Sequence, residues 1–208
     1  MISLESQVLE RHLSFFDGKS VLFAGGISDN FPQTLSSKCQ SIQIWSCYFD
    51  YARTQSSVNF SVEFQGQADL IVYYWTKNKQ EVNFQLLQLL AQAPIDQEIL
   101  IIGENRCGVR SVEKTLEPYG EIAKIDSARR CGLYHFSLQN KPHFELKNVT
   151  VQYGDKVILD HLNWVVQPNQ NWWIKGPNGA GKSTLLSLIT GDHPQAFANH
   201  VMIFGKQR

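Results

Sequence analysis

The sequence has 208 residues, which is enough for one large domain or two small ones. Its formal net charge is zero, so no global basic field indicates a nucleic-acid partner, and any contact with RNA must come from local patches. No apolar run approaches the ~20 residues of a membrane helix, and the N-terminal stretch contains acids and lacks the apolar core of a signal peptide. We therefore expect a cytoplasmic protein without membrane insertion.

The four cysteines lie far apart in the sequence and include no Cys-x-x-Cys pair. We expect them to be reduced cytosolic thiols, and a metal site or a disulfide framework is the alternative. The six histidines show no metal-ligand spacing, so we expect them to be structural or solvated.

Helix and strand patterns alternate through the first part of the chain. Three helices are predicted: one that contains Val8, Leu9 and Leu13 and ends at Asp17-Gly18, one from Asn78 to Pro94, and one over 108–120. The predicted strands are 20–26, 41–50, 68–75, 98–105 and two short strands within 121–138. This order implies parallel crossover units and an α/β sheet with helices on both faces. The polar segment 139–143 contains a proline and is interpreted as a linker, which makes residues 1–140 the first domain.

The pattern restarts after this linker, over residues 141–208. Two strands around Tyr153-Gly154-Asp155-Lys156 predict a hairpin, and the apolar segment 171–176 predicts a buried strand. A helix is predicted from Lys182 to Gly191, and one last strand in which Gly205 turns the chain. The second domain is therefore expected to be a smaller α/β unit.

A glycine-rich loop follows the predicted strand at 171–176. Gly176, Gly181, Lys182 and Ser183 fit the spacing G-x-x-x-x-G-K-[ST], which is typical of a phosphate-binding loop. Glycines let backbone N–H groups approach phosphate oxygens, the lysine adds positive charge, and the serine hydroxyl can bind Mg²⁺. The alternative is a chance glycine-rich turn between a strand and a helix. The candidate ATP-binding residues are Tyr153, Gly176, Asn178, Gly179, Ala180, Gly181, Lys182, Ser183 and Thr184, with Ser183 as the Mg²⁺ ligand.

The stretch from "VTVQYGDKVILDHLNW" to "GPNGAGKSTLLSLITGDHPQ" resembles the start of the ATP-binding domain of ABC transporters of the molybdate-transport and photorepair type. The resemblance implies that an aromatic residue, here Tyr153, stacks on adenine; the alternative is a hairpin residue that packs on its neighbours. The glutamine loop, the signature motif, the Walker B strand and the switch histidine of that family do not occur before Arg208. We therefore expect binding of ATP with Mg²⁺ without efficient hydrolysis.

The first 140 residues resemble the N-terminal half of bacterial small-subunit ribosomal RNA guanine-N2 methyltransferases. The blocks that carry this resemblance are "ADLIVYYWTKNKQEVNFQLLQLL", "IIGENRCGVRSVEKTL" and "KIDSARRCGLY". The resemblance implies a methyltransferase-like domain that has lost its cofactor site and supports folding and RNA engagement. Gly25-Gly26 is a weak remnant of a cofactor loop, and Tyr74-Trp75-Thr76 stands where the catalytic half carries Asn-Pro-Pro-aromatic. We therefore expect that S-adenosylmethionine does not bind.

Basic residues lie at the expected carboxyl edge of this sheet, near Tyr73, Tyr74 and Trp75. The candidate RNA contacts are Lys77, Lys79, Arg106, Arg110, Arg129 and Arg130, and Lys114 is a further basic residue nearby. Basic groups beside aromatic rings suit phosphates and unstacked bases. The alternative is that Tyr73 belongs to the core, Trp75 caps the sheet, and the basic residues pair with acids. The acids in question are Glu81, Glu104, Glu113 and Asp126.

Three functional hypotheses follow. The first is a fusion of a non-catalytic methyltransferase domain with an ATP-binding fragment. The second is a scaffold or assembly domain that associates with ribosomal RNA, or with a complementary chain fragment, and the third is a recombined chain with no selected activity. The sequence leaves open whether the chain is an enzyme, because it lacks the catalytic motifs of both families.

Overall fold

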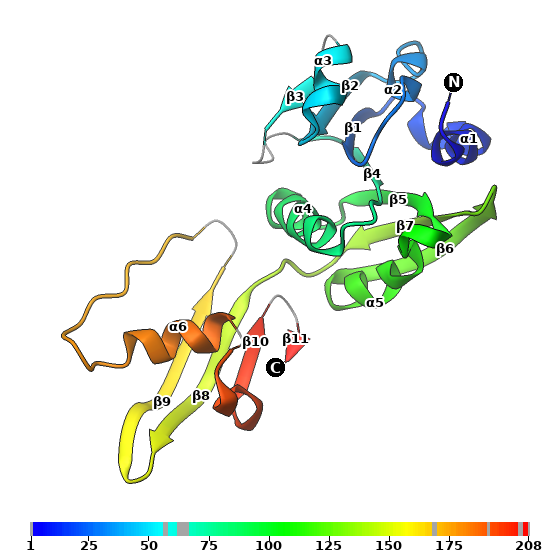
Figure 1. Cartoon of the computed structure of the whole chain (residues 1–208). Coiled ribbons are helices and arrows are strands. Elements are labelled where there is room, and N and C mark those ends of the chain that lie inside the picture. Colours follow the sequence, from blue (N-terminus) through cyan, green and yellow to red (C-terminus); the bar gives the residue numbers. More distant parts are fainter. Residues whose placement is uncertain are drawn as a thin grey trace. The chain divides into compact units, whose positions relative to one another are not determined.

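The computed structural model describes residues 2–55, 58–61, 67–167, 170–190, 192–203 and 206–207. It divides into two compact units, Met1–Asn140 and Lys141–Arg208 (Figure 1). Each unit has a sheet and a core of its own. No helix among the described residues is both long enough and apolar enough to cross a membrane.

Unit 1 is built on a seven-stranded sheet in its described part, with the order β3-β2-β1-β4-β5-β7-β6. The strands are β1 (Ser20–Gly25), β2 (Ser41–Ser46), β3 (Val58–Phe60), β4 (Leu70–Tyr74), β5 (Glu98–Glu104), β6 (Gly120–Ala128) and β7 (Cys131–Leu138). Strands β1 to β5 run parallel, whereas β7 pairs antiparallel with both β5 and β6. The α/β sheet of methyltransferase type that the sequence predicted is confirmed.

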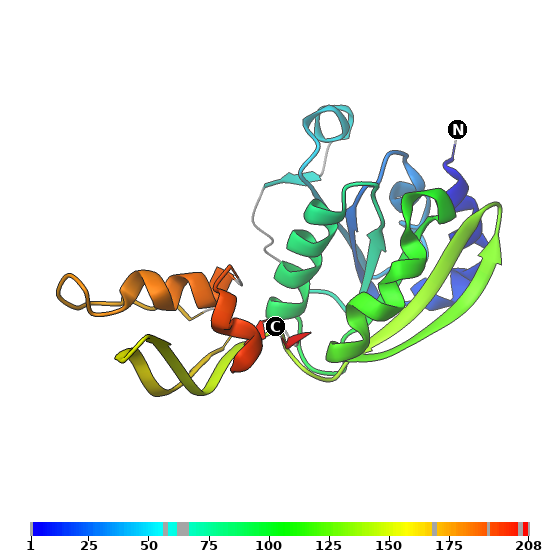
Figure 2. The same cartoon turned by 60° about the horizontal axis from the view of Figure 1, so that its bottom comes forward.

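Helices cover both faces of this sheet (Figure 2). The helices are α1 (Leu4–Leu9), α2 (Phe31–Thr34), α3 (Phe49–Thr54), α4 (Lys79–Gln92) and α5 (Val112–Leu116), with 3-10 turns η1 (Glu10–Phe16), η2 (Asn105–Cys107), η3 (Val109–Ser111) and η4 (Glu117–Tyr119). The apolar stripe of α4 and the buried side of α5 form one core with Tyr73 and Tyr134. Helices α1 and α2 form the other core with Phe23. Both faces are buried, which explains why β1, β4 and β5 are almost wholly apolar.

Local features of unit 1 differ from the sequence prediction. The strand predicted at 41–50 ends at Ser46, and the chain then enters α3. The helix predicted at 108–120 is reduced to the five residues of α5 between 3-10 turns, because Gly108 has a φ of 83° and Pro118 lies in η4. Helix α2 and strand β3 were not predicted.

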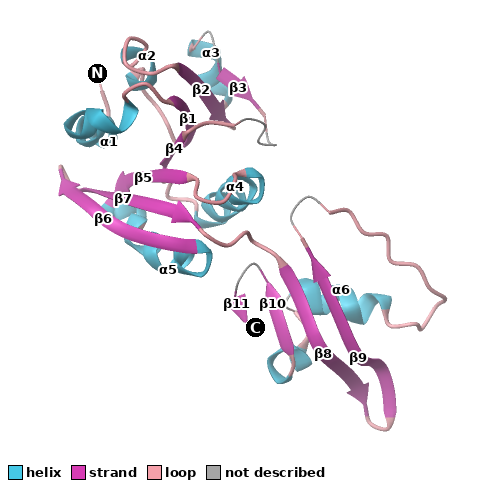
Figure 3. Ribbon diagram, turned by 180° about the vertical axis from the view of Figure 1, so that it is seen from behind, coloured by secondary structure: helices cyan, strands magenta, loops and turns pink. Residues whose placement is uncertain are grey.

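Unit 2 is an antiparallel sheet with the order β11-β10-β8-β9 and one longer helix packed on it (Figure 3). The elements are β8 (Phe144–Tyr153), β9 (Lys156–Val166), α6 (Lys182–Thr190), η5 (Pro194–Ala198), β10 (His200–Ile203) and β11 (Lys206–Gln207). Tyr153 pairs with Lys156, so the predicted hairpin is confirmed. The predicted helix end at Gly191 and the turn at Gly205 lie outside the described residues.

The buried strand predicted at 171–176 is wrong. The described residues from 170 to 177 form no strand, and Trp172 and Trp173 are 57% and 80% exposed. A buried strand needs a hydrogen-bonding neighbour on each side, and in this sheet β8 already pairs with β9 and β10. Trp172 packs edge-on against Trp164 at 5.4 Å between ring centroids, and the Lys175 ammonium lies 3.5 Å from the Trp173 ring centroid.

Candidate functional site

The carboxyl ends of β1, β2 and β4 surround a cavity of about 520 Å³. Its walls are the segments that follow these three strands, and the lining residues are Gly26, Ile27, Ser28, Tyr48, Asp50, Tyr51, Thr54, Trp75 and Thr76. In open parallel sheets, ligands bind at this edge, outside the ends of the strands. We call it the carboxyl-edge cavity.

The turn after β1 lets two strand ends approach closely at this cavity. Gly25 has a φ of 85°, and a Cβ added to it would lie 2.3 Å from the carbonyl oxygen of Tyr74 at the end of β4. The N–H of Gly26 donates to that same oxygen at 2.8 Å. Gly25-Gly26 therefore forms a close glycine turn at the cavity wall, and the sequence had indicated only a weak remnant of such a turn.

The lining fits a nucleoside-sized ligand. A cavity of 520 Å³ is within the range of small-molecule sites, and Tyr48 and Trp75 supply aromatic surface. Asp50 follows β2, where a carboxylate accepts hydrogen bonds from ribose hydroxyls in related nucleotide folds. Burial raises the pKa of Tyr51 to about 12, and its hydroxyl donates to the carbonyl oxygen of Asp29 at 2.9 Å, so this tyrosine stays neutral and supports the wall.

The six predicted RNA contacts are all exposed and come from three places in unit 1. Lys77 and Lys79 lie at and before the start of α4, Arg106 and Arg110 lie in the 3-10 turns after β5, and Arg129 and Arg130 form the β6–β7 turn. The last four meet around Asn105. The Asn105 N–H donates to the Arg130 carbonyl at 2.8 Å, and Arg110 Nε donates to Asn105 Oδ1 at 3.3 Å. We call these six residues the basic edge.

The alternative of internal ion pairs holds for part of this set. Arg106 pairs with Glu104 at 2.6 Å, as that alternative predicted. The pairing of Arg129 and Arg130 with Asp126 is wrong, because Asp126 instead binds His12 Nε2 at 2.7 Å and lies 3.5 Å from Arg11 Nε. The hydrogen bond from His12 is the main reason that the pKa of Asp126 is lowered.

The aromatic residues near the basic edge belong to the core. Tyr73 is fully buried and its hydroxyl donates to Gln85 Oε1 at 2.8 Å, while Trp75 is 6% exposed and its Nε1 donates to the Cys107 carbonyl at 3.2 Å. Tyr74 is also buried. An RNA base therefore cannot stack on these rings. The four cysteines are free thiols.

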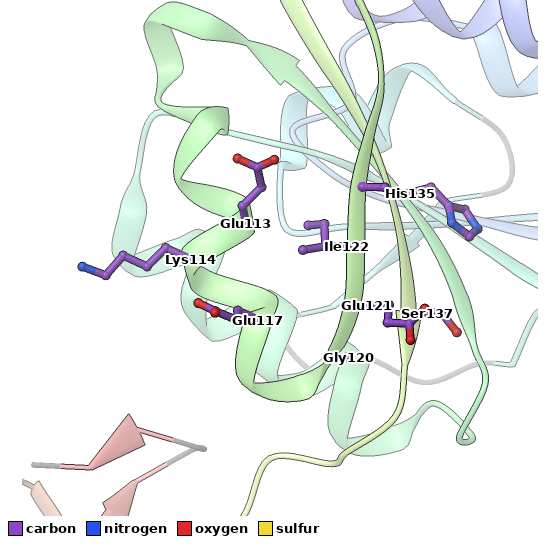
Figure 4. Close-up of a pocket in the computed structure, with 9 residues that line it drawn as sticks. Glu113, Lys114, Glu117, Gly120, Glu121, Ile122, His135 and Ser137 are labelled. Atoms are coloured by element: carbon purple, nitrogen blue, oxygen red, sulfur yellow. The ribbon is translucent and has the colours of Figure 1, made fainter.

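A second cavity of about 900 Å³ lies between α5 and the β6–β7 ribbon (Figure 4). Glu113 and Glu117 reach it from α5, and Glu121 lies beside it at the start of β6. Lys114, which the sequence placed among the basic residues near the sheet edge, lines this acidic cavity instead. Its charge is opposite to the one that phosphates need, so it is not a candidate for RNA.

In unit 2, the phosphate loop connects the extended segment to α6. Gly179 and Gly181 have φ values of 83° and 84°, and α6 begins at Lys182, so the positive end of the helix dipole faces the loop. Lys182 Nζ donates to the carbonyl oxygens of Gly176 and Pro177 at 2.7 and 2.8 Å. These bonds hold the ammonium over the loop, where a phosphate would compete for it. Asn178, Ala180 and Ser183 are exposed, whereas Thr184 is half-buried.

Tyr153 lies at the end of β8, and its ring is 56% exposed. Its hydroxyl is 2.8 Å from His193 Nε2, and the two rings are tilted by 65° in an edge-on contact. The loop and this strand end belong to one region, because an added Cβ on Gly181 would lie 3.0 Å from Ile158 Cγ2 in the facing strand β9. The sequence analysis missed His193, since no periodicity links residues 40 positions apart.

Comparison with known proteins gives two matches that do not overlap. The profile of the family "Methyltransferase small domain N-terminal" matches residues 6–153, and that of the family "ABC transporter" matches residues 159–207. The first match ends inside unit 2, because it includes all of β8.

Curated relatives match the N-terminal part. "Ribosomal RNA small subunit methyltransferase C" of Haemophilus influenzae (strain 86-028NP) is 90% identical over 160 residues, which cover 77% of this chain and 48% of that protein. The protein of the same name from Pasteurella multocida is 71% identical over 146 residues, covering 70% of this chain and 44% of that protein. The chain thus spans about half the length of the curated relatives it matches.

A solved structure, the ribosomal protein L11 methylase from Lactobacillus delbrueckii subsp. bulgaricus, aligns with a TM-score of 0.51 at 14% identity over 66% of this chain and 78% of that one. At that identity the likeness concerns the fold alone, and it agrees with the methyltransferase-type sheet of unit 1.

The expectation that S-adenosylmethionine does not bind is wrong. The relatives that match at 71% to 90% identity are named methyltransferases, which use a methyl donor. The physical reason for the error lies at the turn after β1. The sequence was read for a longer glycine motif, whereas Gly25-Gly26 alone provides the close approach to β4, and a cavity lies beside it.

Proposed function

Because this chain belongs to the methyltransferase small domain N-terminal family, we propose that residues 1–140 are the RNA-engaging domain of a small-subunit ribosomal RNA methyltransferase. The observation that carries this proposal is the basic edge beside the carboxyl-edge cavity. Its six cations come from three separate segments and are all exposed, and Glu104 forms an ion pair with only one of them.

The basic edge engages phosphates rather than bases. Its arginines and lysines are exposed and the neighbouring aromatic rings are buried, so the contact is electrostatic and depends on salt. The carboxyl-edge cavity is the place for the methyl donor: Asp50 would hold its ribose hydroxyls, and Tyr48 and Trp75 would pack on its base. When bound, this cofactor supplies the methyl group. Tyr74-Trp75-Thr76 offers no Asn side chain for a guanine amine, so the transfer step belongs to a catalytic half.

The RNA proposal is tested by the affinity of the full chain for a fragment of small-subunit ribosomal RNA at several salt concentrations. The double variant Arg106→Glu/Arg130→Glu should bind more weakly, and the slope of log affinity against log salt should flatten by about 1.4, from ~0.7 for each lost phosphate contact to a single strand. The matched control Lys114→Glu/Lys124→Glu has the same charge change away from the basic edge and should retain affinity. Equal losses in both variants would refute a localised RNA interface.

The cofactor part of the proposal has a separate test. Calorimetric titration with S-adenosyl-L-homocysteine should give saturable binding to the full chain. Asp50→Ala should weaken this binding about tenfold or more, because the ribose loses a charged acceptor. Saturation that is equal in both proteins would place the ligand elsewhere.

A second candidate function concerns unit 2. We infer that the phosphate loop binds ATP with Mg²⁺: Lys182 and the backbone N–H groups of the loop hold the phosphates, and Ser183 holds the metal ion. The supporting observation is the inward turn of Gly179 and Gly181 at the start of α6. Titration with a fluorescent ATP analogue should be saturable and Mg²⁺-dependent, and Lys182→Ala should abolish it. Equal signals from the two proteins would end this proposal.

A further inference from the structure

We infer that His193 is a positioning residue for Tyr153 and thereby sets the preference of the phosphate loop for a purine nucleotide over a bare polyphosphate. This inference rests on the proposed binding of ATP. It assigns a role to a histidine outside the loop, on a different element from the stacking residue.

The protonation of His193 follows from its hydrogen bonds. The Gln195 N–H donates to His193 Nδ1 at 3.1 Å, so Nδ1 acts as an acceptor and carries no proton. The proton of the neutral ring is therefore on Nε2, which lies 2.8 Å from the hydroxyl oxygen of Tyr153. His193 donates this bond, and the tyrosine oxygen accepts it.

The imidazole is fixed on its own side. His193 is 5% exposed and is the N-cap of η5. The side chain of Gln195 ties η5 to the backbone of Gln152: Gln195 Nε2 donates to the Gln152 carbonyl at 2.8 Å, and the Gln152 N–H donates to Gln195 Oε1 at 3.3 Å. The residue that orients Tyr153 is thus attached to the strand position directly before it.

The geometry leaves a face of the Tyr153 ring free. The hydroxyl is held at one end and the histidine contacts the ring edge-on, while 56% of the residue remains exposed. A planar base can stack on such a face. Because the ring is already oriented, binding does not have to immobilise it, and this saving is equivalent to about a fivefold gain in affinity.

The experiment compares Mg-ATP with Mg-tripolyphosphate, which has the phosphates and no base. His193→Asn keeps an N-cap acceptor for Gln195 but cannot reach Tyr153, so it should weaken Mg-ATP about fivefold and leave Mg-tripolyphosphate within about twofold. His193→Gln, whose longer amide can donate to the tyrosine, should restore most of the loss. In a Tyr153→Phe background, His193→Asn should have no further effect on either ligand.

Several results would overturn the inference. They are unchanged ATP affinity in His193→Asn, equal weakening of both ligands, which indicates a merely structural role, and a loss that persists in the Tyr153→Phe background. If Lys182→Ala leaves the binding of both ligands unchanged, the phosphate-loop proposal itself fails.

The positioning role is measured separately in the ligand-free protein. Nitrogen-15 NMR should give the Nε2–H tautomer for His193, and ring relaxation should show Tyr153 more mobile in His193→Asn. An Nδ1–H tautomer, or the same mobility in both proteins, refutes the role.

Discussion

The glycine turn after β1 offers a test of how the sheet edge is built. Gly25→Ala introduces two separable costs: the residue keeps a φ of 85°, and its new Cβ would lie 2.3 Å from the Tyr74 carbonyl oxygen. The conformational cost alone is about 1 kcal/mol. The collision is with backbone rather than with a flexible side chain, so β4 must shift or the bond from the Gly26 N–H must break, for about 2 kcal/mol more.

The expected total is about 3 kcal/mol of lost stability in unit 1, or a fall in melting temperature of about 10 °C for a domain of this size. Gly18→Ala is the matched control, because Gly18 has a φ of 69° and a Cβ there would meet nothing within 4 Å. It should cost only the conformational part, about 1 kcal/mol.

The assay must report unit 1 by itself, since a chain of two units need not unfold in one step. Hydrogen exchange of the β1 and β4 amides, read by mass spectrometry, gives the free energy of opening for those strands. The close approach at the cavity wall would be refuted if Gly25→Ala and Gly18→Ala lowered that free energy equally.

Three further predictions concern single side chains. Because His12 lowers the pKa of Asp126, the pair stabilises the fold above the ordinary aspartate pKa and this contribution is lost as pH falls through the lowered value; Asp126→Asn should therefore flatten the acid limb of a stability-against-pH curve from urea unfolding. Tyr73→Phe leaves Gln85 Oε1 without its buried donor and should destabilise unit 1 by about 1–2 kcal/mol in the same urea assay, with near-native circular dichroism. Leu188→Ala removes a fully buried side chain from the unit 2 core and should cost about 2–4 kcal/mol, measured by exchange of the β8 amides while β1 exchange is unchanged; a loss under 1 kcal/mol would mean that α6 is not packed as described.

The sequence predicted the elements that obey one strong local rule. Strands β1, β4 and β5 are apolar runs buried on both faces, and α4 carries a regular apolar stripe. Its start was also predictable, because Asn78 Oδ1 accepts hydrogen bonds from the N–H groups of Gln80 and Glu81. For these elements the local pattern and the tertiary environment agree.

The features that were missed or mistaken depend on partners distant in sequence. The segment 171–176 has the composition of a buried strand, but an apolar segment becomes a strand only where another strand offers hydrogen bonds. Asp126 was expected to pair with its near neighbours Arg129 and Arg130, whereas the fold brings His12 to it from 114 positions away. Short elements such as α2, α3 and β3 have too few residues to establish a period.

Strand β8 illustrates how local irregularity reconciles pattern and core. Phe144 and Leu146 face the core of unit 2, and strict alternation would next turn Asn148 and Thr150 inward. The β8–β9 register shifts between Leu146 and Val149, and Asn148 has a φ of 52°.

This extra residue is a bulge that reverses the parity of the strand, so that Val149 and Val151 are fully buried instead. The methyltransferase family match runs through this strand to residue 153, although its partners β9 and β10 lie largely within the ABC transporter match. A strand thus takes its place from the face it can bury, and a single bulge is enough to align a segment matched by one family with a sheet that is otherwise matched by another.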